Sequence, residues 1–160
     1  MLELHAMMQP SSGAGDMTMT LNEFGDRIRW AWQETYYRGN INALDEIYAP
    51  DVVIHSPPFP DQKGIDSYKR HAAEALQLYS NIRYHWEEII GEGNTIVIVA
   101  TMHMKHTGTS PMLPIPATGK ELMVKGCRIA HVMDGKIIEE FNYADFLGLF
   151  QQLGIVPPME

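Results

Sequence analysis

The spacing of apolar residues changes near residue 82, and this change constrains the fold more than any other feature of the sequence. Before it, apolar residues recur every three or four positions, which is the period of an amphipathic helix. After it, Ile82, Tyr84 and Trp86 begin an alternation with polar residues, which is typical of half-buried β-strands. Helices followed by long strands predict an α+β architecture, with helices covering one face of a mostly antiparallel, strongly curved sheet.

Helix signals bound the first part of the chain. Thr20 followed by Glu23 forms a capping box, and the helix that begins there is expected to end at Gly39. Pro50 is expected to stop a second, short helix before a short strand that ends at His55. The predicted helices cover residues 21–39, 42–49 and 64–80, and the short strand covers residues 52–55.

Long alternating segments fill most of the second part. Asp134-Gly135 is a strong hairpin turn between the last two strands, and Gly154 closes a short apolar helix after Asp145. Two loops rich in proline and glycine, 56–64 and 108–119, are where we expect functional residues. The predicted strands begin at residue 82 and continue over 95–106, 120–133 and 136–143.

Composition limits the classes of function. The chain has 160 residues, and we expect a flexible leader over residues 1–16 and a single domain over 17–160. A formal charge of −8 argues against nucleic acid and anionic membranes as partners. The single cysteine, Cys127, and the lack of a long apolar segment favour a cytoplasmic protein.

Five short motifs follow one another along the chain. They are His55-Ser-Pro-Pro-Phe-Pro with Gly64, Lys105-His106-Thr-Gly108, Pro116-Ala-Thr-Gly119-Lys120, Asp134-Gly135-Lys136-Ile137-Ile138-Glu139, and Asp145 with Gln152-Leu-Gly154. In this order they resemble the SnoaL-like polyketide cyclases of the nuclear transport factor 2-like superfamily. This resemblance implies a cone-shaped α+β barrel with a deep apolar pocket and a homodimer packed through the outer sheet surface. It also implies ring closure by intramolecular aldol condensation, with an acid/base aspartate and neither a metal nor an organic cofactor.

Asp145 matches the position of the family's acid/base aspartate, so we expect its carboxyl group to project into the pocket and to transfer protons. The alternative is that Asp145 only caps the short helix that follows it. Alternation along the last strand puts Phe141 and Tyr143 on the same face as Asp145, and both are therefore expected to line the pocket. A bulge in this strand would reverse these faces.

Two histidines at strand ends, His55 and His106, are expected to assist Asp145 by hydrogen-bonding or polarising a substrate carbonyl group. The alternative is that each bonds a backbone carbonyl. His71 and His85 are interpreted as surface residues, and no metal site is expected. The remaining residues expected to contact substrate are Phe59, His103, Met102, Met104 and Trp32.

The resemblance therefore implies a protein that binds a small hydrophobic carbonyl compound and closes a ring by acid/base chemistry without a cofactor. Ketosteroid-isomerase-like proton transfer is one alternative. Limonene-epoxide-hydrolase-like addition of water is another, for which Arg128 and Asp145 are present but a second pocket aspartate is not identifiable. A non-catalytic ligand-binding module, with Asp145 only as a helix cap, is a third.

Overall fold

The first helix forms as its capping signals predict. The computed structural model describes residues 20–158, so the predicted leader lies outside the described residues. Helix α1 (Leu21–Arg38) begins at a capping box in which the Glu23 backbone N–H donates to the Thr20 hydroxyl at 3.3 Å. The Glu23 carboxylate accepts from the Thr20 backbone N–H at 2.8 Å. Gly39, with φ of 76°, ends the helix in the left-handed conformation that glycine adopts readily.

The structure corrects the prediction around Pro50. Residues Ile41–Glu46 form a 3-10 helix, η1, and strand β1 (Tyr48–His55) begins before the proline rather than after it. Pro50 is tolerated in a strand because the pairing of β1 with its neighbour shifts register between Tyr48 and Val53. A missing N–H group is acceptable where the ladder of hydrogen bonds is already interrupted.

The remaining elements follow the predicted periods closely. Helix α2 (Ile65–Leu78) leads directly into strand β3, which begins a few residues before the predicted change of period. At the hairpin, Asp134 and Gly135 both have positive φ, 51° and 70°, as a tight two-residue turn requires. The other elements are β2 (Gln62–Lys63), β3 (Tyr79–Glu92), β4 (Thr95–His106), β5 (Glu121–Met133), β6 (Lys136–Ala144) and α3 (Phe146–Leu153).

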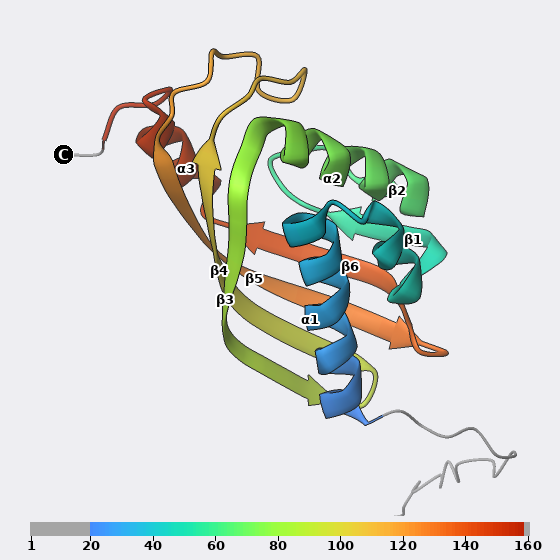
Figure 1. The fold of residues 1–160 in the computed structure, drawn as a ribbon. Coiled ribbons are helices and arrows are strands. Elements are labelled where there is room, and N and C mark those ends of the chain that lie inside the picture. The colour runs from blue at the N-terminus through green and yellow to red at the C-terminus, as the bar shows by residue number, and fades with distance from the viewer. Residues whose placement is uncertain (1–19, 159–160) are drawn as a thin grey trace, which may run out of the picture.

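The strands form a six-stranded sheet in the order β2-β1-β6-β5-β4-β3. All neighbouring pairs are antiparallel except β1 and β6, which run parallel. The sheet is strongly curved, and α1 and α2 lie on the same face of it (Figure 1). The predicted α+β class is confirmed, but the sheet is not closed into a barrel, because β2 and β3 are its edges.

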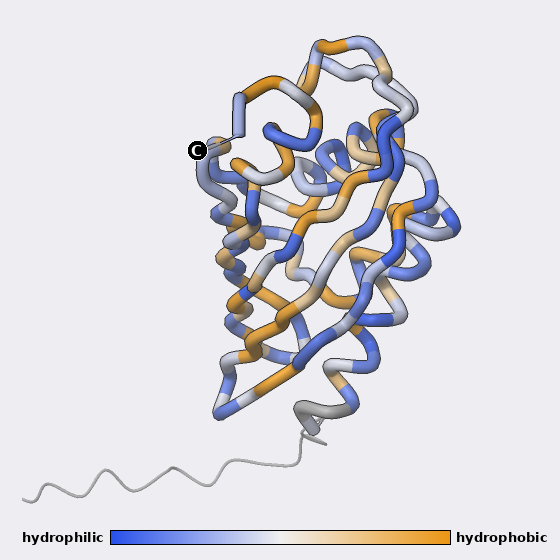
Figure 2. Tube along the Cα trace, turned by 90° about the vertical axis from the view of Figure 1, so that its left-hand side faces the viewer, coloured by the Kyte–Doolittle hydropathy of each residue, from blue (hydrophilic) through white to orange (hydrophobic). Residues whose placement is uncertain are grey.

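The core lies between the helices and the inner face of the curved sheet. Ile28 and Trp32 of α1 are buried there, together with Ile96 and Ile98 of β4 and Ala130 of β5. Figure 2 shows hydrophobic residues recurring along neighbouring strands. Within the described residues, no helix is both long enough and apolar enough to cross a membrane.

Candidate functional site

A cavity of about 310 Å³ opens between the inner face of the sheet and the three α-helices. Such a volume lies within the range of small-molecule sites, and its lining is mostly apolar, as those sites usually are. The apolar lining includes Phe59, Ala75, Ala100, Met102, Met104, Met112, Leu113, Phe146, Leu149 and Phe150. The polar or ionisable lining residues are Trp32, Tyr36, His71, Tyr79, Tyr84, Arg128 and Asn142.

The middle of the sheet supplies the inner wall of the cavity. Cross-strand pairing places Ala100 opposite Gly126 and Ile98 opposite Arg128, and all four residues line the cavity. Paired residues share one face of an antiparallel sheet, so this register turns the even-numbered residues of β4 inward. The small residues Ala100 and Gly126 leave space where larger side chains would fill the cavity.

Among the described residues, Arg128 is the one guanidinium in the lining, and its charge is balanced within the fold. Its Nη1 pairs with the carboxylate of Glu140, whose side chain is 0% exposed. The Tyr48 hydroxyl donates to the same carboxylate at 2.8 Å, and the Arg128 guanidinium lies 4.4 Å from the ring centroid of Trp32. Burial alone would lower the pKa of Arg128, but Tyr68 and Glu140 hold that pKa well above its ordinary value.

A chain of hydrogen bonds runs from Arg128 to a tyrosine of the cavity. Arg128 Nη1 donates to the Tyr68 hydroxyl at 3.3 Å, and the hydroxyls of Tyr68 and Tyr36 are 3.5 Å apart. A guanidinium can only donate, so the Tyr68 oxygen accepts and its hydrogen can point to Tyr36. The Tyr36 hydrogen is then free to donate to a ligand. Burial, followed by the proximity of Tyr68, raises the pKa of Tyr36, which keeps this phenol protonated.

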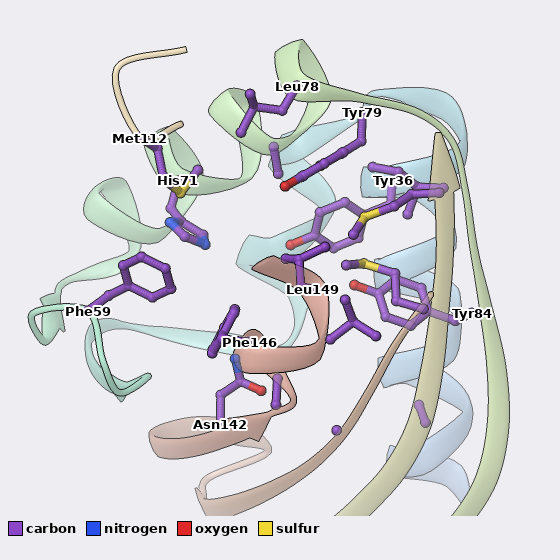
Figure 3. Close-up of a pocket in the computed structure, with 18 of the residues that line it drawn as sticks. Tyr36, Phe59, His71, Leu78, Tyr79, Tyr84, Met112, Asn142, Phe146 and Leu149 are labelled. Atoms are coloured by element: carbon purple, nitrogen blue, oxygen red, sulfur yellow. The ribbon is translucent and has the colours of Figure 1, made fainter. Parts of the chain in front are cut away.

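Polar groups face one another across the cavity (Figure 3). His71 and Phe59 lie on one side, and the hydroxyls of Tyr36, Tyr79 and Tyr84 point inward from the other. Burial, followed by the charge of Arg128, lowers the pKa of His71, so its imidazole is neutral near neutral pH. Burial raises the pKa values of Tyr79 and Tyr84, so both remain protonated. The cavity thus holds one neutral base and several phenolic donors.

Two sets of hydrogen bonds fix segments that carry lining residues of the cavity. The backbone N–H groups of Thr107 and Gly108 both donate to the carbonyl of Leu78, at 3.0 Å. A Cβ atom at Gly108 would lie 1.9 Å from the Gln77 carbonyl oxygen, so this close approach requires glycine. On the other side, the Gln152 amide bonds both backbone groups of Met123, at 2.8 and 2.9 Å, and fastens α3 to β5.

The structure corrects the expected position of Asp145. Its side chain is exposed, it is not part of the cavity lining, and its Oδ1 accepts a hydrogen bond from the Gly148 backbone N–H at 2.8 Å. Asp145 is therefore the N-cap of α3. A Cβ atom at Gly148 would lie 2.2 Å from Asp145 Oδ2, so the glycine leaves room for the capping carboxylate.

A register shift explains why the last strand presents other residues to the cavity. Next to the tight turn, Val132 of β5 pairs with Ile137 of β6. The register of the two strands shifts after this pair, so the next pair is His131 with Glu139. This shift pairs Arg128 with Asn142 on the inner face, and it puts Phe141 and Tyr143 on the outer face, contrary to expectation. The expectation from the sequence therefore exchanged the inner and the outer face of β6.

Replacing the Asp145 side chain tests its role as a helix cap. Asn caps helices about as well as Asp, so Asp145→Asn is expected to leave thermal stability nearly unchanged. Asp145→Ala removes the acceptor for the Gly148 N–H and should cost about 0.5–2 kcal/mol of stability. Denaturant unfolding of both variants measures this difference. Equal losses for both variants would contradict the capping role.

None of the three histidines expected in the pocket lines the cavity. His55 lies near the outer sheet face, where it pairs with Asp61 at 2.9 Å and Glu139 at 3.4 Å. Hydrogen bonding to Asp61, and then to Glu139, raises the pKa of His55. His106 is buried, and its Nδ1 accepts from the Thr118 backbone N–H at 3.2 Å. His103 is exposed on β4.

Four of the residues expected to contact substrate do line the cavity: Trp32, Phe59, Met102 and Met104. Their role in substrate binding remains a prediction. Of the polar lining residues, Trp32 is expected in the pocket from the sequence, but Tyr36, Tyr79, Tyr84 and Asn142 are not, and His71 is expected at the helix surface. Its position was detectable, because residue 71 lies three residues after Tyr68 and four before Ala75, which is the spacing of one helical face.

With the curved sheet, covering helices and apolar cavity established, comparison with known proteins identifies the class of protein. The sequence profile of the SnoaL-like polyketide cyclase family matches residues 26–153. The chain belongs to this family.

Relatives of known activity are distant. The aklanonic acid methyl ester cyclase DauD of Streptomyces sp. (strain C5) is 26% identical over 111 residues, covering 69% of this chain and 66% of that protein. The aklanonic acid methyl ester cyclase DnrD of Streptomyces peucetius is 26% identical over 109 residues, covering 68% and 72% of the two chains. The match to DauD thus spans slightly less than two thirds of that relative.

Solved structures show the same fold. A protein described as a SnoaL-like polyketide cyclase from Jannaschia sp. CCS1 has a TM-score of 0.75 at 18% identity, covering 91% of this chain and all of that one (100%). TsrD from Streptomyces laurentii has a TM-score of 0.73 at 22% identity, covering 83% and 96%. At these identities the likeness concerns the fold alone.

Proposed function

We propose that the protein binds a small hydrophobic carbonyl compound in its cavity and closes a ring in it by acid/base catalysis. The observation that supports this most is the apolar cavity of about 310 Å³ with inward-pointing phenolic hydroxyl groups. Apolar walls bind the carbon skeleton, while a few polar groups fix the orientation of its oxygens. The relatives named aklanonic acid methyl ester cyclases support an ester similar to aklanonic acid methyl ester as the substrate.

The chemistry is an intramolecular aldol condensation. A base removes a proton from a carbon activated by neighbouring carbonyl groups, and the resulting enolate carbon attacks a ketone carbon of the same molecule. One C–C bond forms, the π bond of the ketone breaks, and the new alkoxide takes up a proton, so substrate and product are isomers. Arg128 donates a hydrogen bond to Tyr68, whose hydroxyl contacts that of Tyr36. The Tyr36 hydroxyl would then donate to the oxygen on which negative charge develops and stabilise it.

Turnover of aklanonic acid methyl ester tests this proposal. The purified protein is expected to convert it to a product of identical mass and different chromatographic retention, without added metal or cofactor. Heat-denatured protein is the control for spontaneous cyclisation. Saturable binding without conversion would contradict catalysis on this ester.

A non-catalytic binding module is the second candidate, and one observation favours it. Among the described residues that line the cavity, none is Asp or Glu. The carboxylate of Glu140, which pairs with the lining residue Arg128, also accepts a hydrogen bond from Tyr48 and is therefore committed to the fold. A module of this kind would bind apolar carbonyl compounds tightly and leave them unchanged.

We also propose that two copies of the chain associate through the outer face of the sheet. The cross-strand pairs Val99 with Cys127 and Ile129 with Phe141 lie there, and Tyr143 is 52% exposed beside them. An apolar sheet face of this kind is suited to a self-complementary interface. Analytical ultracentrifugation should show a dimer at micromolar concentration and a monomer for Tyr143→Glu. A monomeric wild-type protein would contradict the proposal.

A further inference from the structure

His71 is the one imidazole that residues 20–158 contribute to the cavity lining, and it comes from α2, on the opposite side from the tyrosine hydroxyls (Figure 3). Within residues 20–158 its ring nitrogens have no hydrogen-bond partner. Its described ring contact is with Tyr68, whose ring lies at 17° to it with centroids 6.4 Å apart. Structural histidines normally bond a backbone or side-chain group, as His106 does with Thr118. His71 leaves its hydrogen-bonding capacity available to a ligand.

On balance, burial and the charged groups around His71 favour its neutral form. Arg128 of β5 disfavours the imidazolium, and Glu74 on its own helix favours it to a smaller extent. The other titratable groups in the lining are the tyrosines Tyr36, Tyr79 and Tyr84, which are held as neutral phenols. Because no described residue of the lining is a carboxylate, the neutral imidazole of His71 is the strongest proton acceptor among the described lining residues.

We propose that His71 is the catalytic base of this site, an inference that rests on the proposed ring closure. One ring nitrogen takes the proton from the activated carbon, which leaves an enolate and an imidazolium. The enolate oxygen receives a hydrogen bond from the tyrosine side of the cavity. After the C–C bond has formed, the imidazolium returns its proton to the new alkoxide. The proton count balances, and His71 ends in its original neutral state.

The pH dependence has a definite sign. A base acts only when unprotonated, so kcat/KM should fall as the pH decreases through the pKa of His71. Because burial and Arg128 lower this pKa, the fall should lie below the ordinary histidine value of 6.5. At higher pH, kcat/KM should stay level until the tyrosines ionise.

The experiment compares His71→Gln with His85→Gln on aklanonic acid methyl ester. His85 is exposed on β3 and serves as the matched control. We expect His71→Gln to lower kcat by about 10²–10⁴-fold. In this variant kcat/KM should no longer fall as the pH decreases, while His85→Gln should behave as the wild-type protein. Binding of acetonaphthone, a flat neutral ketone, shows whether the His71→Gln cavity remains folded.

A second variant guards against a merely structural effect. His71→Ala leaves space for free imidazole, and added imidazole should restore part of its turnover, which a loss of packing would not allow. If His71→Gln keeps wild-type turnover and pH profile, the assignment of His71 is wrong and ring closure stands. If the wild-type protein does not convert the ester, the proposed function fails and the assignment of His71 fails with it.

Discussion

Glu140→Ala is expected to lower the free energy of unfolding by about 3–5 kcal/mol, because removing one partner of a buried ion pair leaves the other charge unpaired. Glu140 is fully buried and accepts hydrogen bonds from both Arg128 and Tyr48. Its loss therefore leaves a guanidinium and a phenol without their partner. A domain of this size has about 5–15 kcal/mol of stability in total. Urea denaturation measures the change.

Two further variants give this prediction its controls. Glu139 is the adjacent residue on β6, but its side chain is 39% exposed, and Glu139→Ala is expected to cost much less. Replacing the pair together, with Arg128→Met and Glu140→Leu, should recover most of the stability lost in Glu140→Ala. Equal losses for Glu139→Ala and Glu140→Ala would show that the buried pair does not stabilise the fold.

Ala100→Trp is expected to weaken the binding of acetonaphthone by at least about 100-fold, because an indole group would occupy much of the cavity. Ala100 lies in the inner wall, paired with Gly126 of β5 on one side and with Trp86 of β3 on the other. The added volume should cost only about 1–3 kcal/mol of stability, since it enters existing space. Isothermal titration calorimetry measures the affinity.

The matched control places the same side chain elsewhere. Ala117 is exposed in the loop between β4 and β5 and does not line the cavity, so Ala117→Trp should bind acetonaphthone as the wild-type protein does. Unchanged affinity in Ala100→Trp, with the fold intact, would mean that the ligand binds outside this cavity.

Local patterns predicted the elements of the fold because each depends on neighbouring residues. The capping box at Thr20, the Asp134-Gly135 turn and the alternation along β4 are all set within a few positions of the chain. The error at Pro50 has a non-local cause. Whether a proline is tolerated in β1 depends on the pairing of that strand with β6, which the sequence of β1 does not contain.

The polar lining of the cavity was harder to predict, for two physical reasons. One register shift between His131 and Val132 decides that Asn142, and not Phe141, lies beside Arg128. In addition, both faces of β6 carry apolar residues, so hydrophobic alternation does not distinguish inside from outside. His71 was within reach of sequence reasoning, because helical spacing already put it on the face of Tyr68 and Ala75.

The proposed chemistry requires that a carbonyl compound occupies the cavity between α1 and the sheet. Trp32 lines this cavity with an indole Nε1–H that has no partner among the described residues, whereas Trp30 of the same helix is 47% exposed. Titration with acetonaphthone, followed by ¹⁵N–¹H spectra of the indole groups, tests the claim most directly. We predict a saturable shift of the Trp32 resonance with that of Trp30 unchanged. Saturable binding that leaves the Trp32 resonance in place would contradict the account.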